Sequence, residues 1–166
     1  MDTIQLTTNI IDGKPQVGLM LIPKATEEER IATIITVAKI TAFGSRFPLA
    51  IFSMEMTNTR LFAHLLADSA RHDVIEALEA KQANGELQQK IDTIKGKPLY
   101  IDDTPALSVS ELKEKASKLV KEHGVEVIII DYLELLESCD MDSLNDIAKE
   151  LGALLIVLTR NNHEQL

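Results

Sequence analysis

The sequence is poor in cysteine, glycine and proline, and each shortage excludes a class of protein. A single cysteine, Cys139, leaves no possible intrachain disulfide, so a disulfide-stapled scaffold is excluded. Only 7 Gly and 5 Pro accompany 45% hydrophobic residues, which excludes a disordered or collagen-like chain. The length of 166 residues suffices for one compact domain with a real core, and we expect residues 1–166 to form that single domain.

Long apolar runs and an excess of basic side chains are also missing. No apolar run approaches the roughly 20 residues of a membrane span, and the N-terminus lacks the basic-then-apolar pattern of a signal peptide. We therefore expect a protein of a reducing, bacterial-type cytoplasm without membrane contact. The net charge is −9, whereas nucleic-acid binding depends on Lys and Arg neutralising phosphates. We expect no DNA binding by this chain alone, although a local basic patch remains compatible with the composition.

Short runs of Ile, Val and Leu alternate with longer amphipathic stretches, which is the rhythm of strands connected by crossover helices. Several of the runs, such as "VIII" and "LLIVL", are apolar on every residue, which is typical of strands covered by helices on both faces. The sequence therefore predicts an α/β fold with a mostly parallel sheet. Its strands are expected at Val17–Ile22, Leu49–Met54, Pro98–Ile101, Val125–Ile130 and Ala153–Thr159.

Helices are predicted between these strands from apolar residues that recur at helical spacing. One helix follows Ile31, Ile34, Ile35 and Ala38 and is expected to stop near Gly44. The others are expected around Leu61–Leu66, from Val109 with a capping box in "SVSE" at Ser108, and at Asn145–Leu151 before Gly152. The opening residues 1–16 resemble an edge strand and a turn.

Glycine is missing from the stretch Ile22–Thr33, "IPKATEEERIAT", where many α/β proteins hold a phosphate. Three glutamates occupy the start of the helix instead. At about 4 Å and an effective dielectric constant of about 20, one carboxylate facing one phosphate charge costs roughly 4 kcal/mol. "TEEE" is typical of a capping box, in which the Thr26 hydroxyl accepts a first-turn N–H and the Glu29 carboxylate accepts the N–H of Thr26. We expect the helix to carry its own anion here, although an ordinary capped helix predicts the same local structure.

Three further motifs carry a family resemblance. They are "AIFSMEM" (Ala50–Met56), "LYIDDTPALSVSELKEKASKLVKEHG" (Leu99–Gly124) and "VIIIDYLEL" (Val127–Leu135). In this order and spacing they resemble the motor domain of DnaB-type replicative DNA helicases, from about Gly18 to the C-terminus. The resemblance implies a three-layer RecA-like (P-loop NTPase-like) fold and, for an intact member, ATP-dependent unwinding of DNA.

The same resemblance implies a degenerate Walker A loop. The family's Gly-Lys-Thr positions fall on Glu29, Arg30 and Ile31, just after Thr26, so none of the three chemical roles is kept. Arg30 could act as a cation, but a long guanidinium does not replace a lysine that reaches back into a glycine cradle. We therefore expect no nucleotide cofactor.

Two acids match catalytic positions of the family. Glu55 corresponds to its water-activating glutamate and Asp131 to its Walker B aspartate, and both should lie at the carboxyl edge of the sheet. They could hold a hydrated magnesium ion through their oxygens, or they could be relics or helix caps. Without a metal they would be neighbouring like charges, so we expect Glu55→Gln to leave stability unchanged or raise it.

The remaining machinery of the family also looks reduced. Arg160 stands where the family has a glutamine that senses the γ-phosphate, and the segment between Asp131 and the last strand is shorter than the family pattern. The final strands, the second DNA-facing loop and the arginine finger are expected to be missing beyond Leu166. The four histidines lack metal-ligand spacing with Cys139 and are expected on the surface or at helix caps: His64, His72, His123 and His163.

Two functions of different classes remain open. The first is a non-catalytic DnaB-like module that docks on a protein partner, such as a full-length replicative helicase or another replication protein. The second is an ATP-dependent helicase subunit that binds ATP and magnesium through an atypical site, with Asp131 as the metal ligand. Nucleotide binding distinguishes the two.

Overall fold

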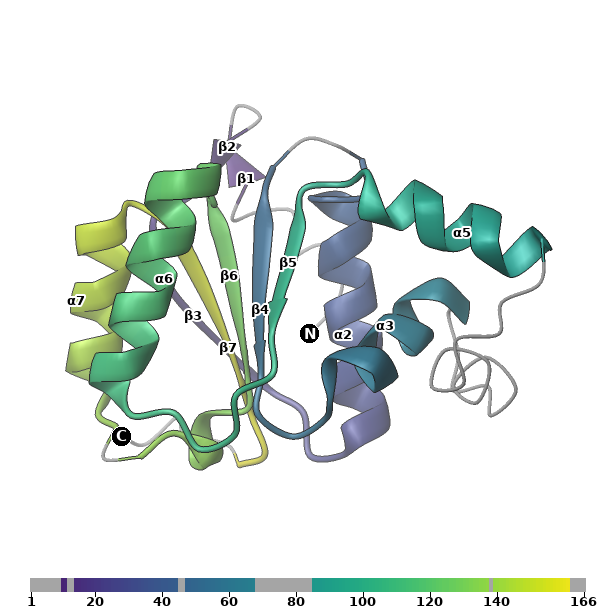
Figure 1. Cartoon of the computed structure of the whole chain (residues 1–166). Helices are drawn as coiled ribbons and strands as arrows, with labels where there is room; N and C mark the ends of the chain where they lie inside the picture. Colours follow the sequence, from purple (N-terminus) through teal and green to yellow (C-terminus); the bar gives the residue numbers. More distant parts are fainter. Residues whose placement is uncertain (1–9, 12–13, 45–46, 68–84, 138, 162–166) are drawn as a thin grey trace.

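The centre of the molecule is a sheet of five strands in a computed structural model that describes residues 10–11, 14–44, 47–67, 85–137 and 139–161 (Figure 1). The strands lie in the order β3 (Gly18–Pro23), β7 (Leu154–Thr159), β6 (Val127–Asp131), β4 (Leu49–Ser53) and β5 (Leu99–Asp102). All four pairings are parallel. This confirms the predicted parallel sheet, and each strand begins and ends within two residues of its prediction.

Helices cover both faces of the sheet, which explains why every residue of β4, β6 and β7 is buried. Helices α6 (Val109–His123) and α7 (Met141–Leu151) lie on one side, whereas α2 (Glu27–Ile40) and α3 (Asn58–Ala67) lie on the other (Figure 1). Alternate residues of β4 belong to two separate hydrophobic cores, with Ile51 in the core under α2 and Phe52 in the core under α6. The predicted α/β fold is therefore a three-layer arrangement.

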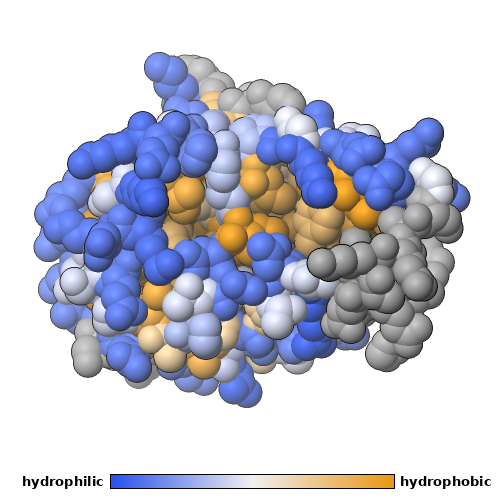
Figure 2. All heavy atoms as spheres, in the orientation of Figure 1, coloured by the Kyte–Doolittle hydropathy of each residue, from blue (hydrophilic) through white to orange (hydrophobic). Residues whose placement is uncertain are grey.

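The edge strand β5 is less covered than the centre of the sheet, since each of its four residues is only half-buried. Figure 2 shows the corresponding surface: hydrophilic residues cover the outer sides of the helices, whereas hydrophobic residues show in the middle of this face. The charged residues of α6 are among the hydrophilic ones, and only Leu112 and Ala116 of that helix are buried. The mixed-charge sequence of α6 is therefore the solvent side of an amphipathic helix.

The helix boundaries follow the predicted caps. In α2, the Glu29 N–H donates to the Thr26 hydroxyl and the Thr26 N–H donates to the Glu29 carboxylate, both at 3.2 Å. Ser108 and Glu111 make the same reciprocal pair at the start of α6. Helix α7 ends at Gly152, whose φ of +64° is left-handed backbone that glycine adopts without steric cost. Both predicted capping boxes are confirmed.

Three elements differ from the sequence prediction. Helix α5 (Gly85–Lys95) was not predicted, because only Ile91 of it is buried and the apolar spacing is too sparse to signal a helix. Helix α7 begins at Met141 rather than Asn145, because the Asp140 carboxylate caps it by accepting the Ser143 N–H at 2.7 Å. Helix α2 ends at Ile40, before the predicted stop near Gly44.

The N-terminal prediction concerned an edge strand and a turn. Strands β1 (Ile10–Ile11) and β2 (Lys14–Pro15) form an antiparallel pair, which is separate from the main sheet. Residues 1–9 lie outside the described residues, as do His72 and His163. Across the described ranges, no helix is both long and apolar enough to cross a membrane.

Candidate functional site

The carboxyl ends of the parallel strands meet at one edge of the sheet, which is where open α/β folds place their sites. Asp131 is the last residue of β6, Glu55 follows β4 by two residues, and Arg160 follows β7 directly. The turn after β3 and the first residues of α2 reach the same edge. Of the residues that the sequence singled out, Arg30, Glu55 and Asp131 come into direct contact.

Arg30 is the centre of this cluster. Its side chain projects from the first turn of α2 and is 2% exposed. Nη2 donates to both carboxylate oxygens of Glu55 at 2.9 Å, and Nη1 donates to the carbonyl oxygens of Lys24 at 3.0 Å and Ala25 at 3.1 Å. The guanidinium therefore ties the turn after β3 to the segment after β4.

Asp131 is the second carboxylate beside the same cation. Its Oδ1 lies 3.3 Å from Arg30 Nε, and its side chain is 1% exposed. Neither carboxylate oxygen has a hydrogen-bond partner among the described residues. Burial, reinforced by the charge of Glu55, raises the pKa of Asp131 to about 7, although Arg30 opposes the shift. The guanidinium of Arg30 thus pairs with two carboxylates. It donates hydrogen bonds to Glu55 and forms only an ion pair with Asp131.

This contact overturns the expectation that Glu55 and Asp131 are neighbouring like charges without a cation. Arg30 pairs with both. The sequence indicated that Arg30 could act as a cation but assigned it no partner. Its side chain folds back toward the sheet edge because a buried guanidinium requires acceptors for its N–H groups, and Glu55 and the carbonyl oxygens of Lys24 and Ala25 provide them.

Two residues make contacts at this edge that sequence reasoning did not predict. The Tyr132 ring lies under the Arg30 guanidinium, with Cζ 4.6 Å from its centroid, and Arg160 Cζ lies 5.7 Å from the same centroid. Glu134 holds the segment after β7: its carboxylate accepts the Arg160 N–H at 3.2 Å and the Thr159 hydroxyl. Both residues lie within the motif "VIIIDYLEL", shortly after Asp131, and that position was the available signal.

The start of α2 presents acids and no cradle for a phosphate. Glu29 caps the helix, and the Thr26 N–H that it accepts lowers the pKa of its carboxyl group. Glu27 accepts from Arg60 at 2.8 Å. Ile31, at the family's threonine position, is buried in the core under α2 and offers no hydroxyl group. The residues at which the sequence predicted a degenerate loop, Thr26, Glu29, Arg30 and Ile31, form the capped start of α2.

The arrangement does not fit a magnesium ion. Glu55 and Asp131 are the acids that could offer oxygens, but Arg30 already occupies the space next to both. Among the described residues, no group of three or more His, Cys, Asp or Glu side chains is placed to hold a metal ion. Chemically, the cluster is an ion-pair network around the buried Arg30, in which Asp131 keeps two oxygens without a hydrogen bond to any described residue.

The histidine prediction was wrong for His64. This residue is 3% exposed, and neither ring nitrogen has a hydrogen-bond partner among the described residues. Burial, together with the nearby charge of Arg60, lowers the pKa of His64. The residue lies on the inner face of α3, which the spacing of Leu61 and Leu65 already indicated as apolar. His123, in contrast, is half-exposed and stacks on Tyr100 with ring centroids 4.3 Å apart.

Comparison with known proteins places this geometry in a family. The replicative DNA helicase DnaB of a Nostoc strain is 30% identical over 166 residues, which cover 91% of this chain and 18% of that protein. The replicative DNA helicase DnaC of Bacillus subtilis is 27% identical over 157 residues, covering 87% of this chain and 32% of the relative. The chain therefore spans a third or less of the length of these relatives.

Solved structures support the fold. One solved ATPase domain superposes with a TM-score of 0.70 at 22% identity, over 94% of this chain and 68% of that one. A DnaB-like replicative helicase, solved to describe its interactions with primase, superposes with a TM-score of 0.60 at 21% identity, over 84% of this chain and 37% of that one. The predicted RecA-like fold is confirmed.

A family model described as the DnaB-like helicase C terminal domain matches residues 6–162, almost the whole sequence. Together with the parallel sheet and the acids at its carboxyl edge, this match shows that the chain belongs to the DnaB-like helicase C-terminal domain family.

Proposed function

We propose that this chain is a DnaB-type motor domain that does not hydrolyse ATP and that acts as an interaction or regulatory module in DNA replication. The observation that carries the proposal is the buried contact of Arg30 with Glu55 and Asp131. These acids correspond by resemblance to the water-activating glutamate and the magnesium-ordering aspartate. A side chain of the protein stands where those two acids would meet the ligand.

The hydrogen bonds of Arg30 support this proposal. Arg30 donates through its two terminal nitrogens: Nη2 donates to the Glu55 carboxylate, and Nη1 donates to the carbonyl oxygens of Lys24 and Ala25. Nε lies 3.3 Å from Asp131 Oδ1, an ion pair without a hydrogen bond. Because Arg30 is 2% exposed and is held by Glu55 and two backbone carbonyls, a phosphate could reach its guanidinium only if these contacts break. Moving Arg30 away would leave the buried Asp131 and the partly exposed Glu55 without their counterion, which is costly for the buried carboxylate.

The acids of α2 support the same proposal. A helix N-terminus attracts an anion by only about 0.3–1 kcal/mol at exposed positions. Here Glu29 already accepts the first N–H of the turn, and Glu27 and Glu28 add two further negative charges. A triphosphate would meet repulsion from all three carboxylates.

One observation favours a second candidate, an ATP-binding helicase subunit with an atypical site. Both Asp131 oxygens are buried without a hydrogen bond to any described residue, as expected for a carboxylate that awaits a cation. In this alternative, Arg30 swings away and Asp131 binds magnesium together with ATP. The first candidate needs no such rearrangement, and no cofactor is expected for it.

A protein partner is part of the proposal. One solved DnaB-like replicative helicase of similar fold is described with its interactions with primase, which supports a protein partner. We propose a full-length replicative helicase or another replication protein as the partner of this chain.

Thermal melting with ATP and magnesium tests the proposal. A ligand at 100 times its dissociation constant stabilises the folded state by about 2.7 kcal/mol, which gives a visible shift in Tm. We expect millimolar ATP with magnesium to leave the Tm of the wild type unchanged. A shift of several degrees that persists in Asp146→Asn, an exposed acid on α7, but disappears in Asp131→Asn would overturn the proposal in favour of the second candidate.

A further inference from the structure

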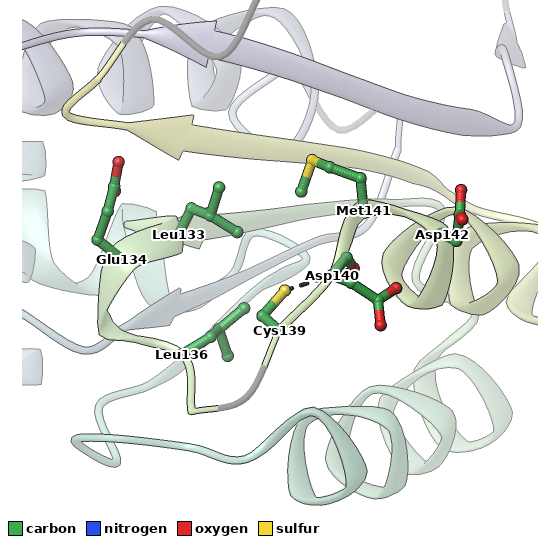
Figure 3. A pocket seen from close by; sticks show the side chains of 7 residues that line it. All are labelled: Leu133, Glu134, Leu136, Cys139, Asp140, Met141 and Asp142. Carbon is green, nitrogen blue, oxygen red and sulfur yellow. Dashed lines mark hydrogen bonds between the residues drawn. The ribbon is translucent and has the colours of Figure 1, made fainter. Parts of the chain in front are cut away.

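A pocket of about 610 Å³ opens next to the candidate site, between the 3-10 helix η1 (Leu133–Leu135) and the start of α7 (Figure 3). Leu133 and Leu136 line it from the segment after β6, and Met141 lines it from the first residue of α7. Both leucines are less than 10% exposed, and they form the apolar wall of the pocket. The volume is within the range of about 300–1,000 Å³ that is typical of binding pockets.

The charged side chains of this pocket are all negative: Glu134, Asp140 and Asp142. The Glu134 carboxylate accepts a hydrogen bond from the Arg160 N–H, and Asp140 Oδ1 accepts the Ser143 N–H at 2.7 Å. Asp142 is exposed, and no contact with another described residue engages its carboxylate. Its negative charge is therefore available at the rim.

The apolar wall and the acidic rim together determine which class of ligand this pocket can bind. Nucleotides and other phosphate-bearing ligands meet repulsion from the three carboxylates. A purely apolar guest would leave the rim without a counterion. A guest that carries an apolar side chain beside a Lys or Arg satisfies both parts, because the side chain fills the pocket and the cation meets Asp142.

We infer that the pocket bounded by Leu133, Leu136, Met141 and Asp142 is a docking site for a basic, apolar segment of a protein partner. This inference rests on the proposed role as an interaction module and adds the chemistry of the partner. One apolar side chain of that segment occupies the pocket, and a neighbouring Lys or Arg pairs with the rim acids. Most of the affinity comes from the buried apolar side chain, whereas the charges set orientation and specificity.

A cysteine in the pocket allows its occupancy to be measured. Cys139 lines it and is the one cysteine of the sequence, so alkylation of the native protein reads out this position alone. Its Sγ lies 3.6 Å from the carbonyl oxygen of Asp140, within the pocket wall (Figure 3). A guest that fills the pocket must slow the reaction of Cys139 with iodoacetamide.

The probe is a short amphipathic peptide of leucine and lysine that carries a fluorescent label. Its control has the same leucine pattern with glutamate in place of lysine. We expect the Lys peptide to raise the fluorescence anisotropy and to slow Cys139 alkylation at least about fivefold at saturation, which mass spectrometry measures. The Glu peptide should do neither. Absence of Cys139 protection by the Lys peptide, or equal protection by both peptides, would overturn the inference.

Matched variants separate this site from general attraction to an acidic protein. Asp142→Lys should weaken binding of the Lys peptide about tenfold or more, whereas Asp146→Lys, one turn further along α7 and outside the pocket, should change it less than about twofold. Asp142→Asn serves as a milder second variant with an intermediate loss, and circular dichroism checks the folding of all three. Equal losses in the Asp142 and Asp146 variants would contradict the inference.

The outcome is independent of the nucleotide test. If ATP gives no melting shift and the peptide does not protect Cys139, the docking site is wrong and the proposed function stands. If ATP stabilises the protein through Asp131, the proposed function is wrong whatever the peptide does.

Discussion

Arg30 illustrates what a sequence shows at the scale of one residue. Its chemical type was predictable, because a cation at the family's lysine position can be read directly from "TEEERI". Its contacts across the fold were not, because its hydrogen-bond acceptor Glu55 lies 25 positions away and its ion-pair partner Asp131 lies further still. A long flexible side chain can reach several partners, and only the fold decides which ones it meets.

The Arg30 network reverses the expected effect of Glu55→Gln. Hydrogen bonds to charged groups are worth about 1.5–3 kcal/mol, and removing one partner of a buried pair leaves the other without compensation. Glutamine keeps one acceptor oxygen but not the charge, so we expect a loss of about 1–3 kcal/mol in the free energy of unfolding. Urea melts measure it, with the exposed Glu28→Gln as a control that should change stability by less than about 0.5 kcal/mol. Unchanged or raised stability in Glu55→Gln would show that the network is unimportant.

The stability cost of Glu55→Gln should also depend on pH, because Glu55 affects the pKa of Asp131. The folded pKa of Asp131, about 7, lies above its unfolded value near 3.9, so the folded state holds the proton more tightly. The free energy of unfolding therefore falls as pH rises from about 4 to about 7, by at most about 1.4 kcal/mol per pH unit. Glu55→Gln removes a charge that raises this pKa, so its cost should be larger at pH 5 than at pH 8. An equal cost at both pH values would contradict the coupling between the two acids.

At the scale of elements, the sequence predicted best where local chemistry decides the structure. The capping boxes at Thr26 and Ser108 depend only on residues three apart, and both were predicted and confirmed. The strands were equally clear, because burial on both faces demands apolar residues throughout. Helix α5 was missed because it buries only Ile91, so its helical spacing left almost no apolar trace.

Helix α2 allows a direct test of its cap. Thr26→Ala removes the hydroxyl that accepts the Glu29 N–H, and we expect the free energy of unfolding to fall by about 0.5–2 kcal/mol. Ser108→Ala, in the second capping box, should lower the free energy of unfolding by an amount in the same range. Glu29→Gln should cost less than Thr26→Ala, because the amide oxygen can still accept the Thr26 N–H.

The cap also depends on pH. The Thr26 N–H lowers the pKa of Glu29 in the folded state, so the contribution of this carboxylate is present above its unfolded value near 4.3 and fades as pH falls through the folded value. Urea melts of wild type and Glu29→Gln at pH 7 and pH 3 should therefore converge at the lower pH. If Thr26→Ala leaves stability unchanged at neutral pH, the cap does not hold the start of α2.

At the scale of the whole molecule, composition and order of motifs were enough to predict the family and the layered fold. Each of the three motifs contains one strand of the sheet and its carboxyl end, namely β4, β5 and β6. Surface properties were less predictable. The pocket beside η1 joins residues from two elements, and its apolar wall consists of leucines that a sequence cannot separate from ordinary core.

Net charge gives a prediction for the molecule as a whole. With a charge of −9, the chain repels the phosphate backbone of DNA over most of its surface. We expect no change in the fluorescence anisotropy of a labelled single-stranded oligonucleotide at physiological salt and protein concentrations in the micromolar range. Serum albumin, also acidic, provides a baseline. Micromolar binding that weakens steeply with added salt would instead indicate a retained basic patch and favour the helicase alternative.

The guanidinium of Arg30 differs from a bound nucleotide in one further respect: it is covalently part of the chain. It cannot be exchanged, diluted or hydrolysed, so its presence beside Glu55 does not vary with the cellular levels of ATP and ADP. A domain that holds a side chain in place of a nucleotide has no cycle of nucleotide binding and release that could trigger conformational changes. Under the proposed function, the carboxyl edge of this sheet keeps one resting shape through every stage of replication, and a partner meets the same surface each time.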